Sequence, residues 1–132
     1  MSQTARGSFE VKITPQAALE GVGDPSIGRM ALDKRYYGDL EAASLGQMLA
    51  AGTEVKGSAG YVALERVSGT LHGKRGTFVL QHNGLMNRGA PTLTIVVVPD
   101  SGTGELAGLS GSMRIDISDG KHFYTLDYSL AA

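Results

Sequence analysis

The sequence predicts an all-β domain. Nineteen glycines and four prolines are scattered along 132 residues, and they divide the chain into many short segments rather than a few long ones. Within these segments apolar and polar residues alternate with a period of two, which is typical of strands that bury one face. The chain contains no cysteine, which excludes disulfides and thiolate chemistry.

The length and charge of the chain limit its organisation and its partners. A chain of 132 residues fits one domain, expected over residues 1–132, and is long enough to bury a single core. Twelve Lys and Arg against 13 Asp and Glu give a net charge of -1. No broad basic field is therefore available for nucleic acid or for an anionic membrane surface, and neither partner is expected. The first residues, MSQTARGSFEVKI, lack the apolar run of a signal peptide, so we expect a cytoplasmic protein.

The expected strands follow one another along the chain. The first covers residues 8–14 (SFEVKIT), where apolar and polar residues alternate strictly. A loop follows at residues 21–28 (GVGDPSIG), because an Asp-Pro pair flanked by glycines favours a turn. Six further strands are expected at residues 29–37, 60–71, 77–85, 92–98, 109–117 and 121–130.

Residues 38–52 (GDLEAASLGQMLAAG) fit two structures. Asp39 is placed as the N-cap of a helix, strong helix formers follow, and Gly52 stands where a helix often ends. Against a helix, Gly46 interrupts the segment, and the Gly38-Asp39 pair could close a hairpin with the preceding strand. The residues alone leave both structures open.

The glycine cluster at residues 97–108 (VVPDSGTGELAG) raises the question of a phosphate-binding loop. Such a loop needs a helix to follow, because the helix N-terminus supplies the N–H groups that meet the anion. The next segment, LSGSMRIDIS, alternates as a strand does, and the glycine spacing does not match GxGxxG. The cluster is therefore predicted to be a connection between strands, and no cofactor is expected.

Five stretches in chain order carry a resemblance to a known family. They are GSFEVKITPQ, RMALDKRYYGDLEAASLGQMLA, KGSAGYVALERVSGTLHGKRGTFVLQHNGLM, VVPDSGTGELAGLSGSM and DGKHFYTLDYSL. With them the chain resembles a bacterial family of unknown function whose members have an allene-oxide-cyclase-like β-barrel. The resemblance implies an eight-stranded antiparallel β-barrel, in which residues 39–51 form a strand. The resemblance implies no activity and no catalytic residue for this chain, since a shared fold is weak evidence for a shared reaction.

Two hairpins predict which side chains share a face. Asp119-Gly120 is typical of a two-residue type I′ turn, which places Ile115 opposite Tyr124 and Met113 opposite Leu126. Their agreement in polarity supports the register, because a shift by one residue would mix the two faces. On the other, polar face, a surface ion pair between Arg114 and Asp127 is expected.

The second hairpin, ERVSGTLHGKRGTFVLQH, is predicted to turn at Lys74-Arg75. This register places Glu65 opposite Gly84 and Val67 opposite His82, so that two ionisable side chains share an apolar face on neighbouring strands. Together with the other residues predicted on the inner face, they form a candidate pocket composed of Tyr61, Glu65, Phe78, His82, Met113 and Tyr124.

Three functions fit this inner face. The first is a barrel that binds a small apolar molecule with one or two polar groups. The second is an isomerase or cyclase, in which Glu65 or His82 moves a proton while Tyr61 or Tyr124 orients an oxygen. The third is a structural or assembly protein whose filled barrel holds Glu65, His82 and Tyr61 as a buried polar network. A cavity inside the barrel would separate the first two from the third.

The remaining features predict surface roles. The spacing of the three histidines matches no metal motif, and His72 is expected to be exposed in its turn, so no metal is predicted. Lys34-Arg35, with Asp33 and Glu41, is expected to form a solvated strand face. The run LTIVVV at residues 93–98 is apolar on both faces of its strand, which predicts a homo-oligomer, either a dimer or a trimer.

Overall fold

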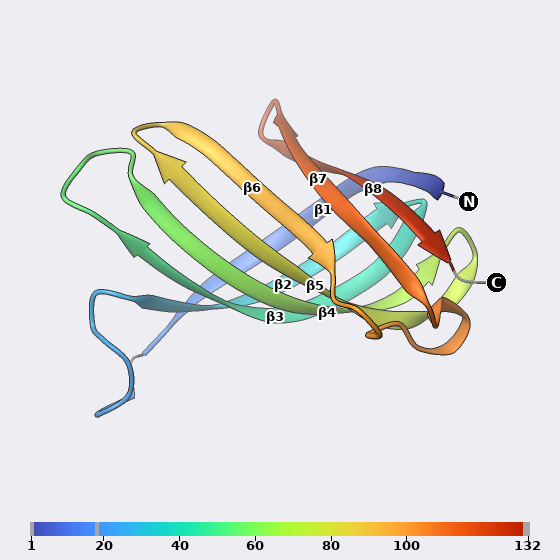
Figure 1. Ribbon diagram of the computed structural model, residues 1–132, viewed down its shortest axis with the longest axis horizontal. Coiled ribbons are helices and arrows are strands. Elements are labelled where there is room, and N and C mark those ends of the chain that lie inside the picture. The colour runs from blue at the N-terminus through green and yellow to red at the C-terminus, as the bar shows by residue number, and fades with distance from the viewer. Residues whose placement is uncertain (1, 18, 131–132) are drawn as a thin grey trace.

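The computed structural model describes residues 2–17 and 19–130 and forms a closed antiparallel barrel of eight strands (Figure 1). Each strand pairs with the next along the chain, and β8 closes the barrel against β1. The strands are β1 (Ser2–Gln16), β2 (Gly28–Gly38), β3 (Leu40–Gly52), β4 (Ala59–Leu71), β5 (Lys74–Asn87), β6 (Ala90–Val97), β7 (Leu109–Ser118) and β8 (Lys121–Leu130). A single turn of 3₁₀ helix, η1 (Gly104–Leu106), lies between β6 and β7. The predicted eight-stranded barrel is confirmed.

β3 shows why the strand prevails over the helix in residues 40–52. The strand is hydrogen-bonded to β2 on one side and to β4 on the other, and it turns Leu40, Ala42 and Ser44 into the barrel. Helix propensity differs between ordinary residues by only about 0.7 kcal/mol or less, so pairing and burial outweigh it. Gly46 serves this strand: a Cβ there would lie 2.1 Å from the carbonyl oxygen of Leu64.

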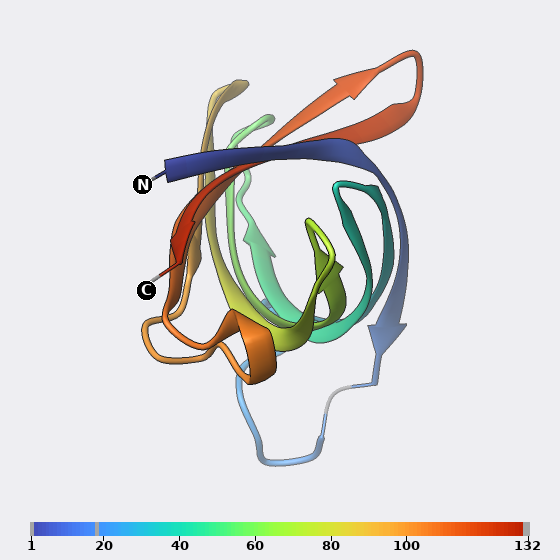
Figure 2. The ribbon, with the colours of Figure 1, turned by 90° about the vertical axis from the view of Figure 1, so that its right-hand side faces the viewer.

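The hydrophobic core fills one end of the barrel, where both termini and η1 lie (Figures 1 and 2). Tyr36 packs edge-on against Tyr124, with ring centroids 5.6 Å apart, and Phe9 packs against Tyr36 at the same distance. Leu106 of η1 is fully buried in this core. The glycine cluster around η1 is thus a connection between strands, as predicted, and it covers part of the packed end.

The other end of the barrel is open. β6 and β7 pair only at Ile95–Met113 and Val96–Ser112, and beyond these pairs the two strands diverge (Figure 1). We call this gap the β6–β7 seam. It extends along residues 90–94 of β6 and 114–118 of β7.

Among the described residues, no helix has the length and apolar character needed to cross a membrane.

One predicted hairpin register is confirmed. Asp119 and Gly120 have φ angles of 51° and 75°, as a type I′ turn requires, and Ile115 lies opposite Tyr124.

The register predicted for the β4–β5 hairpin is wrong. The turn lies at His72-Gly73, whose φ angles of 47° and 80° fit a two-residue turn, and β5 already begins at Lys74. His82 consequently lies opposite Ala63 rather than Val67, and Glu65 lies opposite Leu80 rather than Gly84. Because the shift is four residues, an even number, every side chain keeps its predicted face.

The apolar run in β6 divides between the two faces of its strand. Ile95 and Val97 are buried inside the barrel, while Val96 and Val98 are half-buried on the outside. On the outer surface, four exposed apolar side chains lie on the adjacent strands β3 and β4, at Leu45, Leu49, Val62 and Leu64.

The homo-oligomer stays a prediction, and sedimentation velocity at micromolar concentration tests it. We expect a dimer or a trimer, because exposed apolar side chains on adjacent strands favour association. Sedimentation as a monomer would contradict this expectation.

The β7–β8 turn gives a second prediction. Gly120→Val should lower the free energy of unfolding by about 1–3 kcal/mol, because a β-branched residue is strained at positive φ. Arg114→Ala should cost only about 0–1 kcal/mol, since the Arg114–Asp127 pair is 3.4 Å long and exposed to solvent. Urea denaturation measures both changes. Gly120→Asn is the matched control and should cost less than Val, because Asn tolerates this conformation; a neutral Gly120→Val would mean that the turn differs.

Candidate functional site

The candidate site is built around Glu65, a carboxylate inside the barrel. Its Oε1 accepts hydrogen bonds from the hydroxyl of Tyr36 and from Ser44 Oγ, the latter at 2.8 Å. Its Oε2 accepts from Lys34 Nζ at 2.7 Å and pairs with His82 Nε2 at 2.6 Å. These five residues, which we call the Glu65 cluster, come from the four adjacent strands β2 to β5. A carboxylate offers about four lone-pair sites, so Glu65 is saturated.

The Glu65 cluster is almost completely removed from solvent. Glu65 is 1% exposed, His82 3% and Lys34 6%. Burial by itself raises the pKa of the Glu65 carboxyl, but the hydrogen bond with His82 and the positive charge of Lys34 outweigh it and lower the pKa to about 2. Glu65 is therefore a fixed anion at any physiological pH.

The neighbours of Glu65 are held by further contacts. Burial, followed by the charge of Glu65, raises the pKa of Tyr36 well above its ordinary value, so its hydroxyl remains a neutral donor. Lys34 Nζ lies 5.2 Å from the centroid of the Phe9 ring and 5.9 Å from that of Tyr36, within the range of a cation–π interaction. Lys34 is thus fixed between an anion and two aromatic rings.

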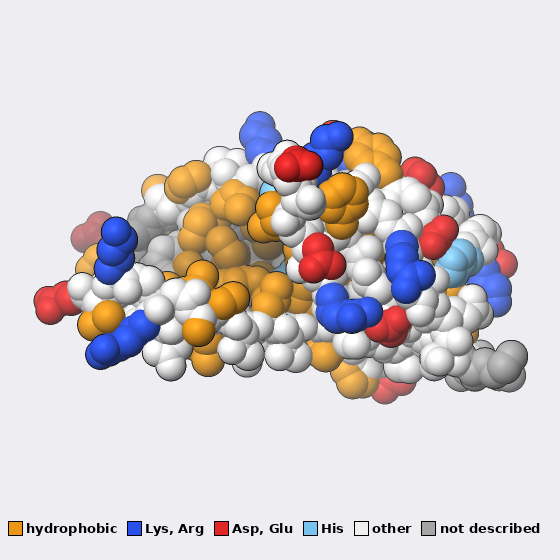
Figure 3. Space-filling view, turned by 90° about the horizontal axis from the view of Figure 1, so that it is seen from above, with side chains coloured by type: hydrophobic (Ala, Val, Ile, Leu, Met, Phe, Trp, Pro, Cys, Tyr) orange, Lys and Arg blue, Asp and Glu red, His pale blue; other side chains and the backbone are white. Residues whose placement is uncertain are grey.

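A cavity of about 560 Å³ begins beside the Glu65 cluster and extends through the open end of the barrel. The view from above shows a hollow lined by hydrophobic side chains (Figure 3). Both strands of the β6–β7 seam contribute to it, with Leu93 on one side and Ile115 on the other. Few polar side chains line it, and they are Lys34, Tyr61, His82, Thr92 and His122.

Tyr61 enters the cavity wall next to His82, with ring centroids 6.5 Å apart. Gly84 lies opposite Tyr61 on β5, and a Cβ there would come within 2.2 Å of the tyrosine ring. The absence of a side chain at Gly84 therefore makes room for the ring. Burial, followed by the charge of Glu65, raises the pKa of Tyr61, so its hydroxyl stays protonated.

The structure separates the predicted pocket residues into two groups. Tyr61 and His82 line the cavity, and Glu65 lies directly behind His82. The other three, Phe78, Met113 and Tyr124, are buried in the hydrophobic core and do not line it.

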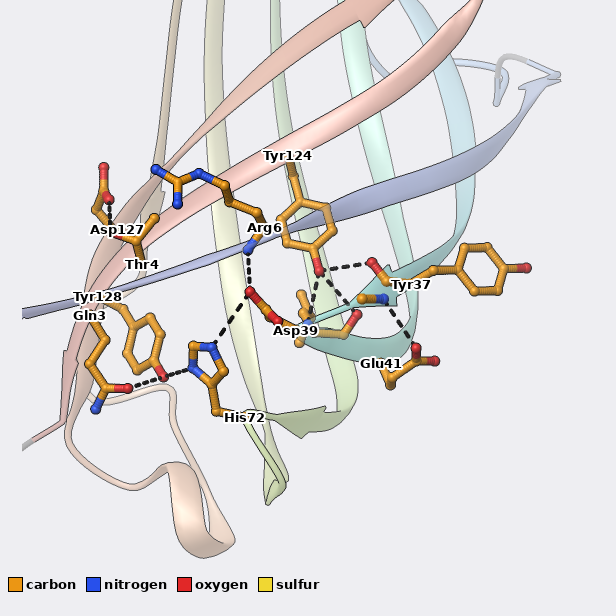
Figure 4. A network of polar contacts seen from close by, with 12 residues as sticks. Gln3, Thr4, Arg6, Tyr37, Asp39, Glu41, His72, Tyr124, Asp127 and Tyr128 are labelled. Carbon is orange, nitrogen blue, oxygen red and sulfur yellow. Dashed lines mark hydrogen bonds and ion pairs between the residues drawn. The ribbon is translucent and has the colours of Figure 1, made fainter.

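Tyr124 has a structural role at the packed end (Figure 4). Its hydroxyl donates to the carbonyl of Tyr37 at 2.9 Å and accepts from the backbone N–H of Leu40 at 2.8 Å. Burial raises its pKa to about 12. Tyr124 therefore connects β8 to the β2–β3 turn and lies outside the cavity in which it was predicted to orient a substrate oxygen.

Sequence reasoning missed four residues of the site. Lys34 was expected on a solvated face but points into the barrel, while Asp33, Arg35 and Glu41 are exposed. The period of two in β2 carried the signal, since residues 32, 34 and 36 share one face. The other residues that were missed are Tyr36, Ser44 and His122.

A second polar network lies at the surface of the packed end (Figure 4). His72 is at the surface, as expected, and its Nδ1 contacts the Tyr128 hydroxyl, which in turn donates to Gln3 Oε1 at 3.1 Å. His72 Nε2 lies 3.6 Å from Asp39 Oδ2, which also accepts the backbone N–H of Arg6 at 2.9 Å. These contacts fasten the β4–β5 turn to β1. Within the part of the chain that the structure describes, no group of three or more His, Asp or Glu side chains could hold a metal ion.

Comparison with known proteins agrees with this architecture. Residues 5–128 match the profile of a protein family, DUF3224, which is described as a protein of unknown function. The chain belongs to the DUF3224 family. A crystal structure of a DUF3224 protein of unknown function from Shewanella oneidensis MR-1 is 50% identical in sequence, with full coverage of both chains and a TM-score of 0.91. A search of the curated proteins finds no match.

The buried charge of this DUF3224 barrel predicts a pH-dependent stability. The pKa of Glu65 in the folded protein, about 2, lies below its ordinary value of 4.5. Glu65 therefore contributes stability that is fully present above pH 4.5 and is lost as the pH falls toward 2. Thermal denaturation between these pH values should show the loss.

Variants of the Glu65 cluster test the origin of this effect. Glu65→Gln should lower the free energy of unfolding at neutral pH by about 3–5 kcal/mol, because it leaves the buried charge of Lys34 unpaired. The double variant Glu65→Gln with Lys34→Met removes both charges, so it should be more stable than Glu65→Gln alone and should depend less on pH below 4.5. Equal stability of the single and the double variant would contradict the buried ion pair.

Proposed function

We propose that the barrel binds one small, largely apolar molecule in the cavity beside the Glu65 cluster. The volume of about 560 Å³ lies within the range of about 300–1,000 Å³ that is typical of ligand pockets. The lining has the composition of such pockets, in which apolar walls hold the body of a ligand and a few polar groups fix its orientation. Here the polar groups Lys34, Tyr61 and His82 lie around one end of an apolar space.

The observation that carries the proposal is the small size of the residues in the open half of the barrel. An eight-stranded barrel is just wide enough for side chains to fill, and in the packed half large side chains do fill it. In the open half, β3, β4 and β5 carry small residues at inward positions, namely Ala50, Ala59, Ala63 and Gly84. Their size leaves the space that a ligand would occupy.

Apolar side chains around the cavity support the same function. Leu85 is 60% exposed and Ile117 68%, and both contribute to the lining. Leaving such side chains in water costs about 25 cal/mol for each Å² of apolar surface, which a bound apolar molecule would recover in part. A ligand that covers them is therefore favoured by the hydrophobic effect.

Proton transfer by Glu65 has no support in this geometry. All four acceptor sites of the carboxylate are occupied, and its pKa of about 2 makes it a poor base. Its role is to hold His82 in place, as a carboxylate behind an imidazole does in many sites. Binding therefore accounts for the site better than an isomerase that relies on Glu65.

A cavity-filling substitution tests the proposal. Ala50→Phe places a large ring at an inward position of β3 and should weaken binding of the neutral fluorescent probe N-phenyl-naphthylamine by about tenfold or more, which is about 1.4 kcal/mol. Ala43→Phe, on the exposed face of the same strand, is the matched control and should bind as the natural protein does. Fluorescence titration measures both. No binding to the natural protein, or equal binding by the two variants, would refute the proposed function.

A further inference from the structure

We infer that the molecule bound in the cavity is an apolar carboxylic acid, whose carboxyl group shares a proton with Nδ1 of His82 and accepts a hydrogen bond from Lys34. The inference rests on the proposed function and specifies its ligand. It follows from which donors and acceptors of the cavity wall remain available after the Glu65 cluster has formed.

Glu65 is the only acid in the Glu65 cluster, and it is unavailable to a ligand. Both of its oxygens already accept two hydrogen bonds each. No carboxylate of Asp or Glu lines the cavity itself among the described residues. A ligand that presents a cation, such as an amine, therefore finds no carboxylate to pair with and meets the ammonium group of Lys34 instead.

Lys34 offers donors only. Its ammonium group carries three N–H donors and no acceptor, and one of the three is used in the bond to Glu65 Oε2. The aromatic rings of Phe9 and Tyr36 lie on its other sides and attract the charge without accepting a conventional hydrogen bond. A ligand oxygen placed beside Lys34 would thus gain a charge-assisted hydrogen bond.

His82 contributes the one atom of the Glu65 cluster that is both unpaired and accessible. Its Nε2 is bonded to Glu65, and no protein atom bonds to Nδ1 among the described residues. Among the described residues, Arg29 Nε is the only side-chain nitrogen or oxygen that is fully buried and has no hydrogen-bond partner. Nδ1 of His82 also has no partner but is not fully buried, so part of this atom is accessible. Because His82 lines the cavity, this nitrogen is available to a ligand.

The charges balance when the ligand is an acid. Glu65 and Lys34 cancel one another, so a bound carboxylate needs one further positive charge. A carboxylic acid brings the proton itself, which moves from its oxygen to Nδ1; a carboxylate instead binds to the imidazole that already holds a proton taken from solvent. Both routes give the same complex, an imidazolium between two carboxylates. An alcohol can bond to the same atoms but brings no charge, so its hydrogen bonds are weaker.

Competition against N-phenyl-naphthylamine tests the inference with three ligands of one chain length: decanoate, decanol and decylamine. Decanoate should bind at least about tenfold more tightly than decanol, a difference of about 1.4 kcal/mol, and decylamine should bind most weakly. His82→Gln should reduce the ratio of decanoate to decanol affinity to about one while the probe still binds. His72→Gln, which alters a histidine outside the cavity, should leave the ratio unchanged.

A pH titration of the natural protein provides a second test that needs no variant. The groups that face His82 are Lys34 on β2, Tyr61 and Glu65 on β4 and, across the cavity, His122 on β8. The affinity for decanoate should fall as the pH rises, because the complex holds one proton more than the neutral site and the free carboxylate, while the affinity for decanol should not change. Calorimetry in buffers of different ionisation enthalpy should show proton uptake with decanoate at the higher pH values.

The outcomes separate the inference from the proposed function. Equal affinity for decanoate and decanol, with the probe bound, would overturn the carboxylic acid and leave the apolar pocket in place. A preference for decanoate that survives His82→Gln, or that does not depend on pH, would overturn the role of His82. Failure of the probe and of all three ligands to bind would refute both proposals together.

Discussion

The buried carboxylate of Glu65 is the constraint on which the rest of the structure depends. Removing an ion from water costs several kcal/mol even after the protein relaxes, so an anion persists inside a barrel only if donors surround it. Here the donors come from β2, β3 and β5, while the anion comes from β4. A shift of any of these strands by one residue would turn its side chain outward and leave a charge or a donor unpaired. The cluster therefore fixes the register of half the barrel, in addition to any part it plays in binding.

The cluster also marks the boundary between two differently built halves of the same strands. Toward the termini, aromatic and leucine side chains fill the interior. Toward the opposite end, alanine and glycine take several inward positions of β3, β4 and β5, and the interior is hollow. Burial of apolar side chains is thus concentrated in one half, and the side chains of the other half are less constrained by packing.

The sequence predicted which side chains of a strand face the interior, but not where along the barrel axis each of them lies. Alternation assigned Glu65, His82 and Tyr61 to one face, and that assignment survived an error of four residues in the β4–β5 register. The same alternation could not distinguish Phe78 and Met113, which pack in the core, from residues that line the cavity, because a period of two says nothing about position along the barrel axis. Lys34 was missed for a different reason: a lysine among charged neighbours is usually solvated, and only its buried partner, which is distant in sequence, reverses that expectation. In residues 40–52, local propensity favoured a helix, and only the resemblance to a barrel family pointed to the strand.

The β6–β7 seam leaves the barrel closed by strand pairing at one end and open along one side at the other end. Elsewhere around the barrel, widening the wall would require backbone hydrogen bonds between neighbouring strands to break. Along the seam, residues 90–94 and 114–118 have no such bonds to one another, so these two edges can separate without that cost. Enlarging the opening therefore requires the two bordering hairpins, β5–β6 and β7–β8, to bend, while every strand pair of the closed half stays intact.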